Sequence, residues 1–334
     1  MTGLVRRLCF TAAALSLAIA APAFGRSEPR FYILGAASGP AISDGIRDVA
    51  FPRTDYASIA FYDFGDSAPY SLVLPRASCL DARSGETSRG NLTAVGSGRL
   101  GWNCDTTLAQ LLIQDLGSDA GYPPADPNHT GLGDADSATP SAFGTRWMSV
   151  LLAGYHYSDA PAYYNLATGA WQPELRSARE YPNLDDPVLA QTMCAPLRRR
   201  IAPNGDPYNS GPEYEPYFYD PPFGVGVVSR KSNRYSVARI TLQRCGSRHL
   251  STIARCVQSC GDVDYSSGLV TWVDARALHA YAPRTRHYYA WRLTQFRPAL
   301  TAASLTHTKQ RVIASIPPVQ GGTEWSIWAA RAPR

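Results

Sequence analysis

The sequence has almost no lysine, no long apolar segment after residue 25 and no sustained helical periodicity. Lys231 and Lys309 are the only lysines among 32 basic residues, so arginine carries nearly all the positive charge. Beyond the N-terminal segment, apolar residues never recur at i, i+3, i+4 and i+7 over three turns, which excludes long amphipathic helices. No later segment approaches the roughly 18 apolar residues of a membrane-spanning helix. These absences favour a nearly all-β chain with no transmembrane segment in its mature part.

The sequence signatures of common enzymes are also missing. The chain contains no G-x-S-x-G, no H-E-x-x-H, no P-loop and no intact S-x-D-x-G-x-x-W. Its six histidines are scattered, with no pair at metal-ligand spacing. The net charge of +5 comes from basic residues spread along the chain, whereas nucleic-acid binding needs a concentrated stripe. We therefore expect no nucleic-acid partner, no cofactor and no metal, and we assign no catalytic residue.

The N-terminus has the features of a secretory signal peptide. Arg6 and Arg7 precede an apolar run from Leu8 to Ala20, and small residues follow in A-x-A order. An apolar run of this length is too short to span a bilayer. We expect residues 1–25 to be a signal peptide and residues 26–334 to form one monomeric domain, secreted or located in the periplasm or outside the cell.

Six cysteines remain after the signal segment, and an even number in an exported chain predicts disulfides. Six cysteines allow 15 pairings. The pairs that we expect are Cys79–Cys104, Cys256–Cys260 and Cys194–Cys245. The alternative is a zinc site at Cys256-x-x-x-Cys260, with Cys245 and His249 nearby.

Short apolar and aromatic runs separated by turn residues predict antiparallel hairpins. The clearest runs from Gly268 to Trp291, with strands expected at 269–272, 278–281 and 287–291. Further strands are expected at 31–34, 58–62, 70–74, 225–228, 235–242, 312–316 and 325–329.

Three stretches are expected to be irregular. Residues 84–98 are rich in glycine, serine and threonine, and residues 121–142 are acidic and turn-forming. Residues 172–222 contain 10 of the 26 prolines, a density that excludes central strands and long helices. We expect long loops near 121–142 and 172–222.

A degenerate repeat connects the hairpins. The run from Gly98 to Trp102, GRLGW, matches that from Gly268 to Trp272, GLVTW. Units begin near 57, 98, 144, 223, 268 and 305, and most are about 36 to 46 residues apart, which is the spacing of propeller blades.

This pattern resembles bacterial exported β-propeller proteins with WD40-, Kelch- or TolB-like repeats, in which a G-x-x-x-W strand precedes one ending in Y-D-x-x-T-G. The resemblance covers most of residues 31–330. It departs from the second motif at Asn165 and Ala282, where the motif has aspartate, and at Arg286, where it has glycine. It implies a β-propeller of about six small antiparallel blades, with tryptophans packed between blades.

The propeller is expected to close by pairing of its N- and C-terminal strands. The strand from Phe31 to Leu34 stands alone in sequence, and an isolated strand of four residues has no stability of its own. We expect it to complete the unit formed by residues 305–330.

Propellers serve as enzymes, receptors and scaffolds, so the fold by itself assigns no activity. We expect a non-catalytic binding protein whose unknown extracellular ligand is a carbohydrate or a protein. The alternative is a hydrolase of extracellular glycans, which needs two or three convergent carboxylates. Asp63, Asp105, Asp159 and Asp274 each follow a predicted strand and are its candidates, although aspartate is also common in turns. His156, at the end of an apolar strand, is the histidine best placed to face a cavity.

Overall fold

The structure, a computed structural model, consists almost entirely of β-strands. The only helix within the described residues is a short 3₁₀ helix, η2 (Leu293–Gln295). The structure describes residues 29–54, 58–65, 70–73, 78–80, 87–89, 91–104, 110–116, 121–122, 137–144, 147–154, 157–172, 213–220, 223–231, 236–244, 249–257 and 260–333.

The strands of the first half are β1 (Tyr32–Ala37), β2 (Ile42–Ser43), β3 (Asp48–Pro52), β4 (Ile59–Asp63), β5 (Tyr70–Val73), β6 (Ser78–Leu80), β7 (Thr87–Arg89), β8 (Asn91–Gly96), β9 (Arg99–Cys104), β10 (Gln110–Asp115), β11 (Gly121–Tyr122), β12 (Ser137–Phe143), β13 (Trp147–Gly154), β14 (Tyr157–Asn165) and β15 (Trp171–Gln172). Those of the second half are β16 (Glu213–Asp220), β17 (Phe223–Lys231), β18 (Ser236–Arg244), β19 (Leu250–Val257), β20 (Gly261–Ser266), β21 (Leu269–Val273), β22 (Ala277–Ala282), β23 (His287–Arg292), β24 (Ser304–His307), β25 (Arg311–Ile316) and β26 (Trp325–Arg331).

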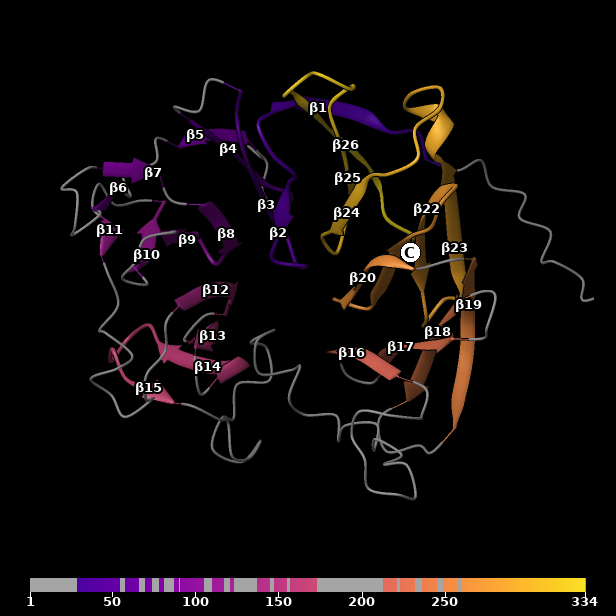
Figure 1. The fold of residues 1–334 in the computed structure, drawn as a ribbon, viewed down its shortest axis with the longest axis horizontal. Coiled ribbons are helices and arrows are strands. Elements are labelled where there is room, and N and C mark those ends of the chain that lie inside the picture. The colour runs from indigo at the N-terminus through magenta and orange to yellow at the C-terminus, as the bar shows by residue number, and fades with distance from the viewer. Residues whose placement is uncertain are drawn as a thin grey trace, which may run out of the picture.

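These strands form six four-stranded antiparallel sheets and one two-stranded sheet, β6–β7, among the described residues. Five of the larger sheets consist of four consecutive strands, β2–β5, β8–β11, β12–β15, β16–β19 and β20–β23. The sixth, called here the terminal sheet, has the order β1-β26-β25-β24. Figure 1 shows the six sheets around a common centre in chain order, with β2, β8, β12, β16, β20 and β24 nearest the centre. We call these the first strands of their sheets, which in the terminal sheet means β24 and not β1. Radial repetition of small twisted sheets is the architecture of a β-propeller.

Most neighbouring sheets touch through their first strands. β2 contacts β8 and β24, β8 contacts β12, and β20 contacts β16 and β24. Among the described residues, the seam between β12 and β16 is the exception, with at most slight contact.

The hydrophobic core lies between the sheets. One cluster joins Leu278 and Trp291 to Val312 and Ala314 of the terminal sheet. Another joins Trp272 to Val225, Ile240 and Leu242 of the preceding sheet. A third joins Trp102 to Ala50, Ile59 and Phe61. Trp102 and Trp272 thus pack between adjacent sheets, as the sequence predicted.

The repeated glycine before each of these tryptophans belongs to a tight hairpin turn. Gly98 and Gly268 have φ values of 71° and 74°, and the serines before them, Ser97 and Ser267, also have positive φ values. Two successive residues with positive φ form the hairpin turn whose twist matches that of the flanking strands. The repeat at Gly98 and Gly268 therefore marks the first turn and the second strand of a sheet. The sheets with units near 98, 144, 223 and 268 begin one strand earlier than those units did.

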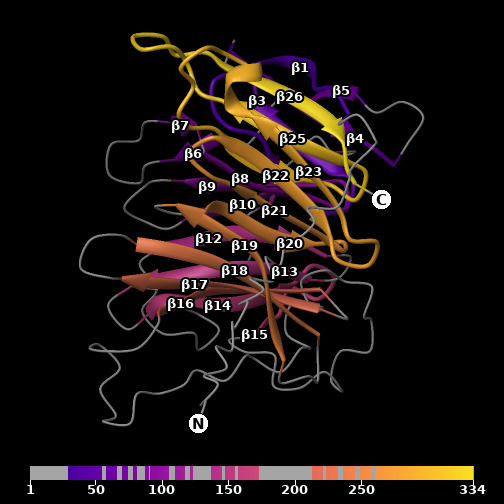
Figure 2. The ribbon, with the colours of Figure 1, turned by 90° about the vertical axis from the view of Figure 1, so that its right-hand side faces the viewer.

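The N-terminal strand belongs to the C-terminal sheet, as predicted. β1 is antiparallel to β26, with Tyr32 opposite Ala329, Ile33 opposite Trp328 and Ala37 opposite Trp325. Figures 1 and 2 both show β1 beside β26. The first and last described strands of the chain are therefore hydrogen-bonded neighbours.

The prediction that three stretches of the chain are irregular is wrong in part. β12 begins inside 121–142, β16 lies inside 172–222, and β8 lies inside 84–98. β12 and β16 are first strands and form one edge of their sheets. The pairing of β12 shifts register between Pro140 and Ala142, and that of β16 shifts between Glu215 and Phe218, the segment that contains Pro216. Edge strands and bulges are the positions where a sheet accepts proline.

Candidate functional site

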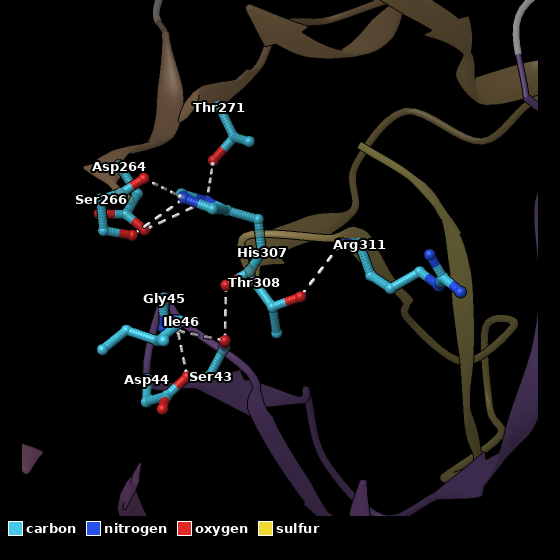
Figure 3. A network of polar contacts seen from close by, with 10 residues as sticks. All are labelled: Ser43, Asp44, Gly45, Ile46, Asp264, Ser266, Thr271, His307, Thr308 and Arg311. Carbon is cyan, nitrogen blue, oxygen red and sulfur yellow. Dashed lines mark hydrogen bonds and ion pairs between the residues drawn. The ribbon is translucent and has the colours of Figure 1, made fainter. Parts of the chain in front are cut away.

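Polar side chains from three sheets meet where the first strands β2, β20 and β24 end (Figure 3). His307, the last residue of β24, is fully buried. Its Nε2 lies 2.9 Å from Ser266 Oγ, and its Nδ1 lies 3.1 Å from Thr271 Oγ1 and 3.4 Å from Asp264 Oδ2. From the next sheet, the Ser43 hydroxyl donates to the His307 carbonyl oxygen over 2.5 Å. This His307 network connects β2, β20, β21 and β24.

Serine, histidine and aspartate in this order are the groups of a hydrolase triad. The surroundings of Ser266 argue against that role. Its own carbonyl oxygen lies 3.1 Å from His307 Nε2 and competes with the hydroxyl for this nitrogen. A Cβ on Gly45 would lie 2.2 Å from Ser266 Oγ, so the Gly45 backbone lies against one side of the hydroxyl. A nucleophile needs open space for the carbon that it attacks. The His307 network therefore holds sheets together.

Three carboxylates lie near the end of β2. Asp44 Oδ1 accepts hydrogen bonds from the backbone N–H groups of Ile46, Arg47 and Asp48 at 2.7, 2.8 and 2.9 Å. Asp48 is 1% exposed, and Arg47 Nε lies 3.6 Å from its Oδ1. Burial raises the pKa of Asp48 to about 7, helped by the charges of Asp44 and Asp63, while Arg47 opposes the rise. Because Asp48 is inaccessible to substrate, its titration bears on stability.

A second polar set lies within the sheet β20–β23. A carboxylate only accepts hydrogen bonds, so His279 Nε2 donates to Asp274 Oδ2 over 2.8 Å. His279 Nδ1 then accepts from the Tyr288 hydroxyl over 2.7 Å. The Trp272 ring stacks on His279 with centroids 4.8 Å apart. Desolvation lowers the pKa of His279 although Asp274 opposes it, so the imidazole is held in its neutral form. Since Trp272 and His279 are both buried, this set stabilises the sheet.

The structure does not bring Asp63 and Asp274 together. Asp63 ends β4, and its Oδ2 lies 3.3 Å from Nη2 of Arg47, which is in the turn after β2. Asp274 lies in the turn after β21, at the opposite end of its sheet. Each accepts a backbone N–H two residues ahead, from Gly65 and Arg276 respectively, as turn-forming aspartates do.

The remaining sequence candidates cannot be placed. Asp105 and His156 lie outside the described residues, and Asp159 belongs to β14 with an undescribed side chain. The hydrolase alternative needs two or three of these carboxylates to converge, and the two that can be located, Asp63 and Asp274, do not converge with each other.

One of the three expected disulfides is present. Cys256 and Cys260 are bonded to each other, so their thiolates are not available for the zinc site considered as the alternative. Cys79 and Cys104 lie in β6 and β9 with undescribed side chains, and Cys194 and Cys245 lie outside the described residues. Within the described ranges, no group of three or more histidine, cysteine or acidic residues is arranged to hold a metal ion. The same ranges contain no helix long and apolar enough to cross a membrane.

A cavity of about 350 Å³ lies where the start of β1 meets the end of β23. We call it the aromatic cavity, and its lining consists of Pro29, Arg30, Phe31, Trp291, Gln295, Phe296 and Trp328.

The rings of the aromatic cavity hold one another in place. The Phe31 ring meets Trp291 and Phe296 edge to face, at centroid distances of 5.0 and 4.9 Å. Phe296 meets Trp328 at 5.7 Å in the same way. Trp291 is buried, and its Nε1 donates to the Pro29 carbonyl oxygen over 2.9 Å. The cavity therefore combines a preformed apolar wall with the exposed polar residues Arg30 and Gln295.

A second cavity, of about 300 Å³, shares Pro29 and Arg30 with the first. Its other lining residues are Tyr32, Gln310, Arg311 and Arg331. We call it the basic cavity, because three arginines and no acidic residue line it.

Sequence reasoning missed both cavities and the His307 network. The lining residues come from segments far apart in the chain, so no local motif marks them. The only available signal was positional: Ser43, Ser266 and His307 each end the first strand of a sheet.

No model of a protein family and no curated protein matches the sequence. The chain is similar to the β-propeller domain of Cps50 (Swd1) from Myceliophteria thermophila, with 10% identity and a TM-score of 0.40 over 90% of this chain and 98% of that one. It is also similar to the extracellular domain of BT4673 from B. thetaiotaomicron, with 9% identity and a TM-score of 0.35 over 88% of this chain. This chain spans 32% of that domain's length.

An oligogalacturonate lyase in complex with manganese is a third similar structure, with 10% identity and a TM-score of 0.34 over 88% of this chain and 78% of that one. All three scores are low, so these similarities carry no argument about function. The radial arrangement of four-stranded sheets is itself the reason to describe the chain as a β-propeller.

Proposed function

We propose that the chain is an exported, non-catalytic β-propeller that binds an extracellular carbohydrate in the aromatic cavity. In this proposal residues 1–25 are a signal peptide, and residues 26–334 form one monomeric domain outside the cytoplasm. The lining of the aromatic cavity, with preformed rings beside two exposed polar side chains, is the observation that carries the proposal.

The proposal includes a ring of six blades. Six four-stranded sheets and the pairing of β1 with β26 support it. Closure further requires the sheets of β12 and β16 to meet, across the one seam where the described first strands make at most slight contact. In a closed ring each sheet buries both faces against neighbours, which is how small sheets become stable.

The chemistry of the aromatic cavity suits a sugar better than a purely apolar ligand. Binding sites combine apolar and aromatic walls with a few polar groups that orient the ligand. A sugar ring presents C–H groups that pack on aromatic side chains and hydroxyl groups that need hydrogen bonds. Here Phe31, Phe296 and Trp328 supply the rings, while Gln295 and Arg30 supply exposed donors.

Thermal shift with a panel of neutral and acidic oligosaccharides tests this function. A ligand at 100 times its dissociation constant adds about 2.7 kcal/mol to stability, enough to raise the melting temperature measurably. We expect a specific oligosaccharide to raise the melting temperature of the wild type and to have no effect on Trp328→Ala or Gln295→Ala.

Trp325→Ala is the matched control. Trp325 lies on the same strand as Trp328 and is similarly half-buried, but it packs toward the sheet β2–β5. It should lose stability and keep the ligand response. The proposal would be contradicted if no carbohydrate raised the melting temperature, or if the increase persisted in both Trp328→Ala and Gln295→Ala. If only a protein bound, the ligand would be that protein and not a carbohydrate.

The described residues give no observation that favours the hydrolase alternative. Asp63 and Asp274 are at opposite ends of their sheets, and the Gly45 backbone lies against the Ser266 hydroxyl. Asp48, whose pKa is raised toward neutrality, is buried.

A further inference from the structure

Two arginines face each other across the last two strands of the terminal sheet. Arg311 begins β25, Arg331 ends β26, and the register places them directly opposite. Directly opposite residues of an antiparallel pair have Cβ atoms about 4.5–5.5 Å apart on one face, and like charges in this position are destabilising. A third arginine, Arg30, lines the same basic cavity.

Within the part of the chain that the structure describes, no acidic side chain lines the basic cavity. The printed contacts of Arg311 are with a hydroxyl, a carbonyl oxygen and an aromatic ring, none of which carries a negative charge. The cavity therefore concentrates positive charge that no acidic residue of its described lining balances.

Arg311 is already held in position. Its Nε donates to the Tyr32 hydroxyl over 3.4 Å, and its Nη1 donates to the Gln310 carbonyl oxygen over 3.2 Å. Its guanidinium group lies 5.5 Å from the centroid of the Phe64 ring. Figure 3 shows this side chain pointing away from the His307 network. Such anchoring reduces the entropy that a guanidinium loses when it binds a ligand.

We propose that the basic cavity is a binding site for an oxyanion, namely a carboxylate, sulfate or phosphate group. A guanidinium carries its donors in a planar fork that matches two oxygens of such a group. The anion would remove the repulsion between Arg311 and Arg331 and neutralise Arg30. The group is either a free inorganic anion or part of an acidic oligosaccharide. This site does not depend on sugar binding in the aromatic cavity.

A second pair of opposed arginines provides a control within the same molecule. Arg239 on β18 is directly opposite Arg255 on β19. Both are exposed, and neither lines the basic or the aromatic cavity. Opposed arginines alone thus do not make a site; the third arginine and the enclosing cavity distinguish Arg311 and Arg331.

Isothermal titration with sulfate and with phosphate, in chloride buffers of constant ionic strength, tests the inference. We expect saturable binding at one site in the wild type. Loss of a hydrogen bond to a charged group should weaken it about tenfold or more in Arg331→Gln and in Arg30→Gln. Both residues are exposed, so these variants should fold. The double variant Arg239→Gln/Arg255→Gln should bind as the wild type does.

A parallel titration identifies the source of the anion. Binding of a uronate or sulfated oligosaccharide much more tightly than the inorganic anion, with its neutral counterpart inactive, would assign the group to a glycan. Equal affinity would assign the site to a free anion. No saturable binding, or binding that survives in both Arg331→Gln and Arg30→Gln, overturns the inference. Trp328→Ala leaves the basic cavity intact, so this variant should still bind sulfate and phosphate. Failure of the carbohydrate proposal can therefore be told apart from failure of the anion site.

Discussion

One residue position recurs at the end of each first strand, just before the hairpin turn. Ser43, Gly96, Ser266 and His307 occupy it in four sheets. The Ser43 hydroxyl donates to the His307 carbonyl oxygen in the terminal sheet. The His307 ring in turn contacts the hydroxyl and the carbonyl oxygen of Ser266 in the sheet β20–β23. The position is repeated, but the residue that occupies it, and the contacts that this residue makes with the neighbouring sheet, differ from one sheet to the next.

The structural role of Ser266 can be separated from a catalytic one. Ser266→Ala removes one partly buried hydrogen bond and should lower the free energy of unfolding by about 1 kcal/mol. Urea denaturation measures this loss. The wild type should also fail to react with a fluorophosphonate probe, because the Gly45 backbone crowds the hydroxyl. Covalent labelling that disappears in Ser266→Ala would show a catalytic serine instead.

Asp48 should make the protein less stable as the pH rises toward neutrality. Its pKa in the folded state is about 7, above the ordinary 3.8, so between these values the folded state binds the proton more tightly. The stabilisation is complete below the lower value and is lost as the pH rises through the upper one. Urea denaturation at pH 5 and pH 8 should show the wild type losing more stability than Asp48→Asn, in which an amide replaces the protonated acid.

Glu324→Gln is the control for this experiment. Glu324 is exposed, and the same acid-to-amide change there should leave the pH dependence as it is in the wild type. If Asp48→Asn and the wild type lose equal stability between pH 5 and pH 8, Asp48 does not titrate in this range.

At the scale of elements, the terminal sheet depends on β1. Deleting residues 26–36 removes nearly all of this strand and exposes the edge of β26 to pairing with other chains. A loss of about 2 kcal/mol would lower the melting temperature by roughly 4–8 °C, and we expect this together with aggregation.

A peptide comprising residues 29–37 should partly restore the melting temperature of the deletion variant. A peptide with the same residues in scrambled order is the control. Unchanged melting and solubility after the deletion would show that β1 contributes nothing to the terminal sheet.

The elements that the sequence predicted well are second, third and fourth strands. The hairpin over 268–291 corresponds to β21, β22 and β23, because these strands bury apolar residues against neighbouring sheets. First strands such as β12 and β16 were missed because they contain prolines, which their edge position and bulges tolerate. The prolines of those two segments were identified correctly, but they led to the wrong prediction that both segments are loops.

At the scale of the whole molecule, the all-β class could be predicted and the candidate sites could not. Short apolar runs, turn residues and the spacing of a degenerate repeat can be read along the chain, and they were enough to predict radial repetition of small sheets. The basic cavity depends on Arg30 lying beside Arg311 and Arg331, which follows only from the pairing of β1 with β26. Local patterns contain no information about such a distant contact.

Circular dichroism and mass spectrometry test the molecule as a whole. The mature protein should show less than about a tenth helix in the far ultraviolet, because propellers contain almost none. Non-reduced peptide mapping should find Cys256 bonded to Cys260 and no free thiol on any of the six mature cysteines. Free thiols would contradict export into an oxidising compartment, and substantial helix would contradict the fold.

The pairing of β1 with β26 also sets the order in which the protein can be assembled. β1 precedes β26 by roughly 290 residues, so at roughly 5–20 residues per second their synthesis is separated by roughly 15–60 s. During that time β1 has no partner, and a chain that stops before β26 never supplies one. An unfinished chain therefore keeps β1 as an exposed, unpaired strand, which quality-control proteases and chaperones can recognise. The terminal sheet can therefore be completed only after β26 has been synthesised.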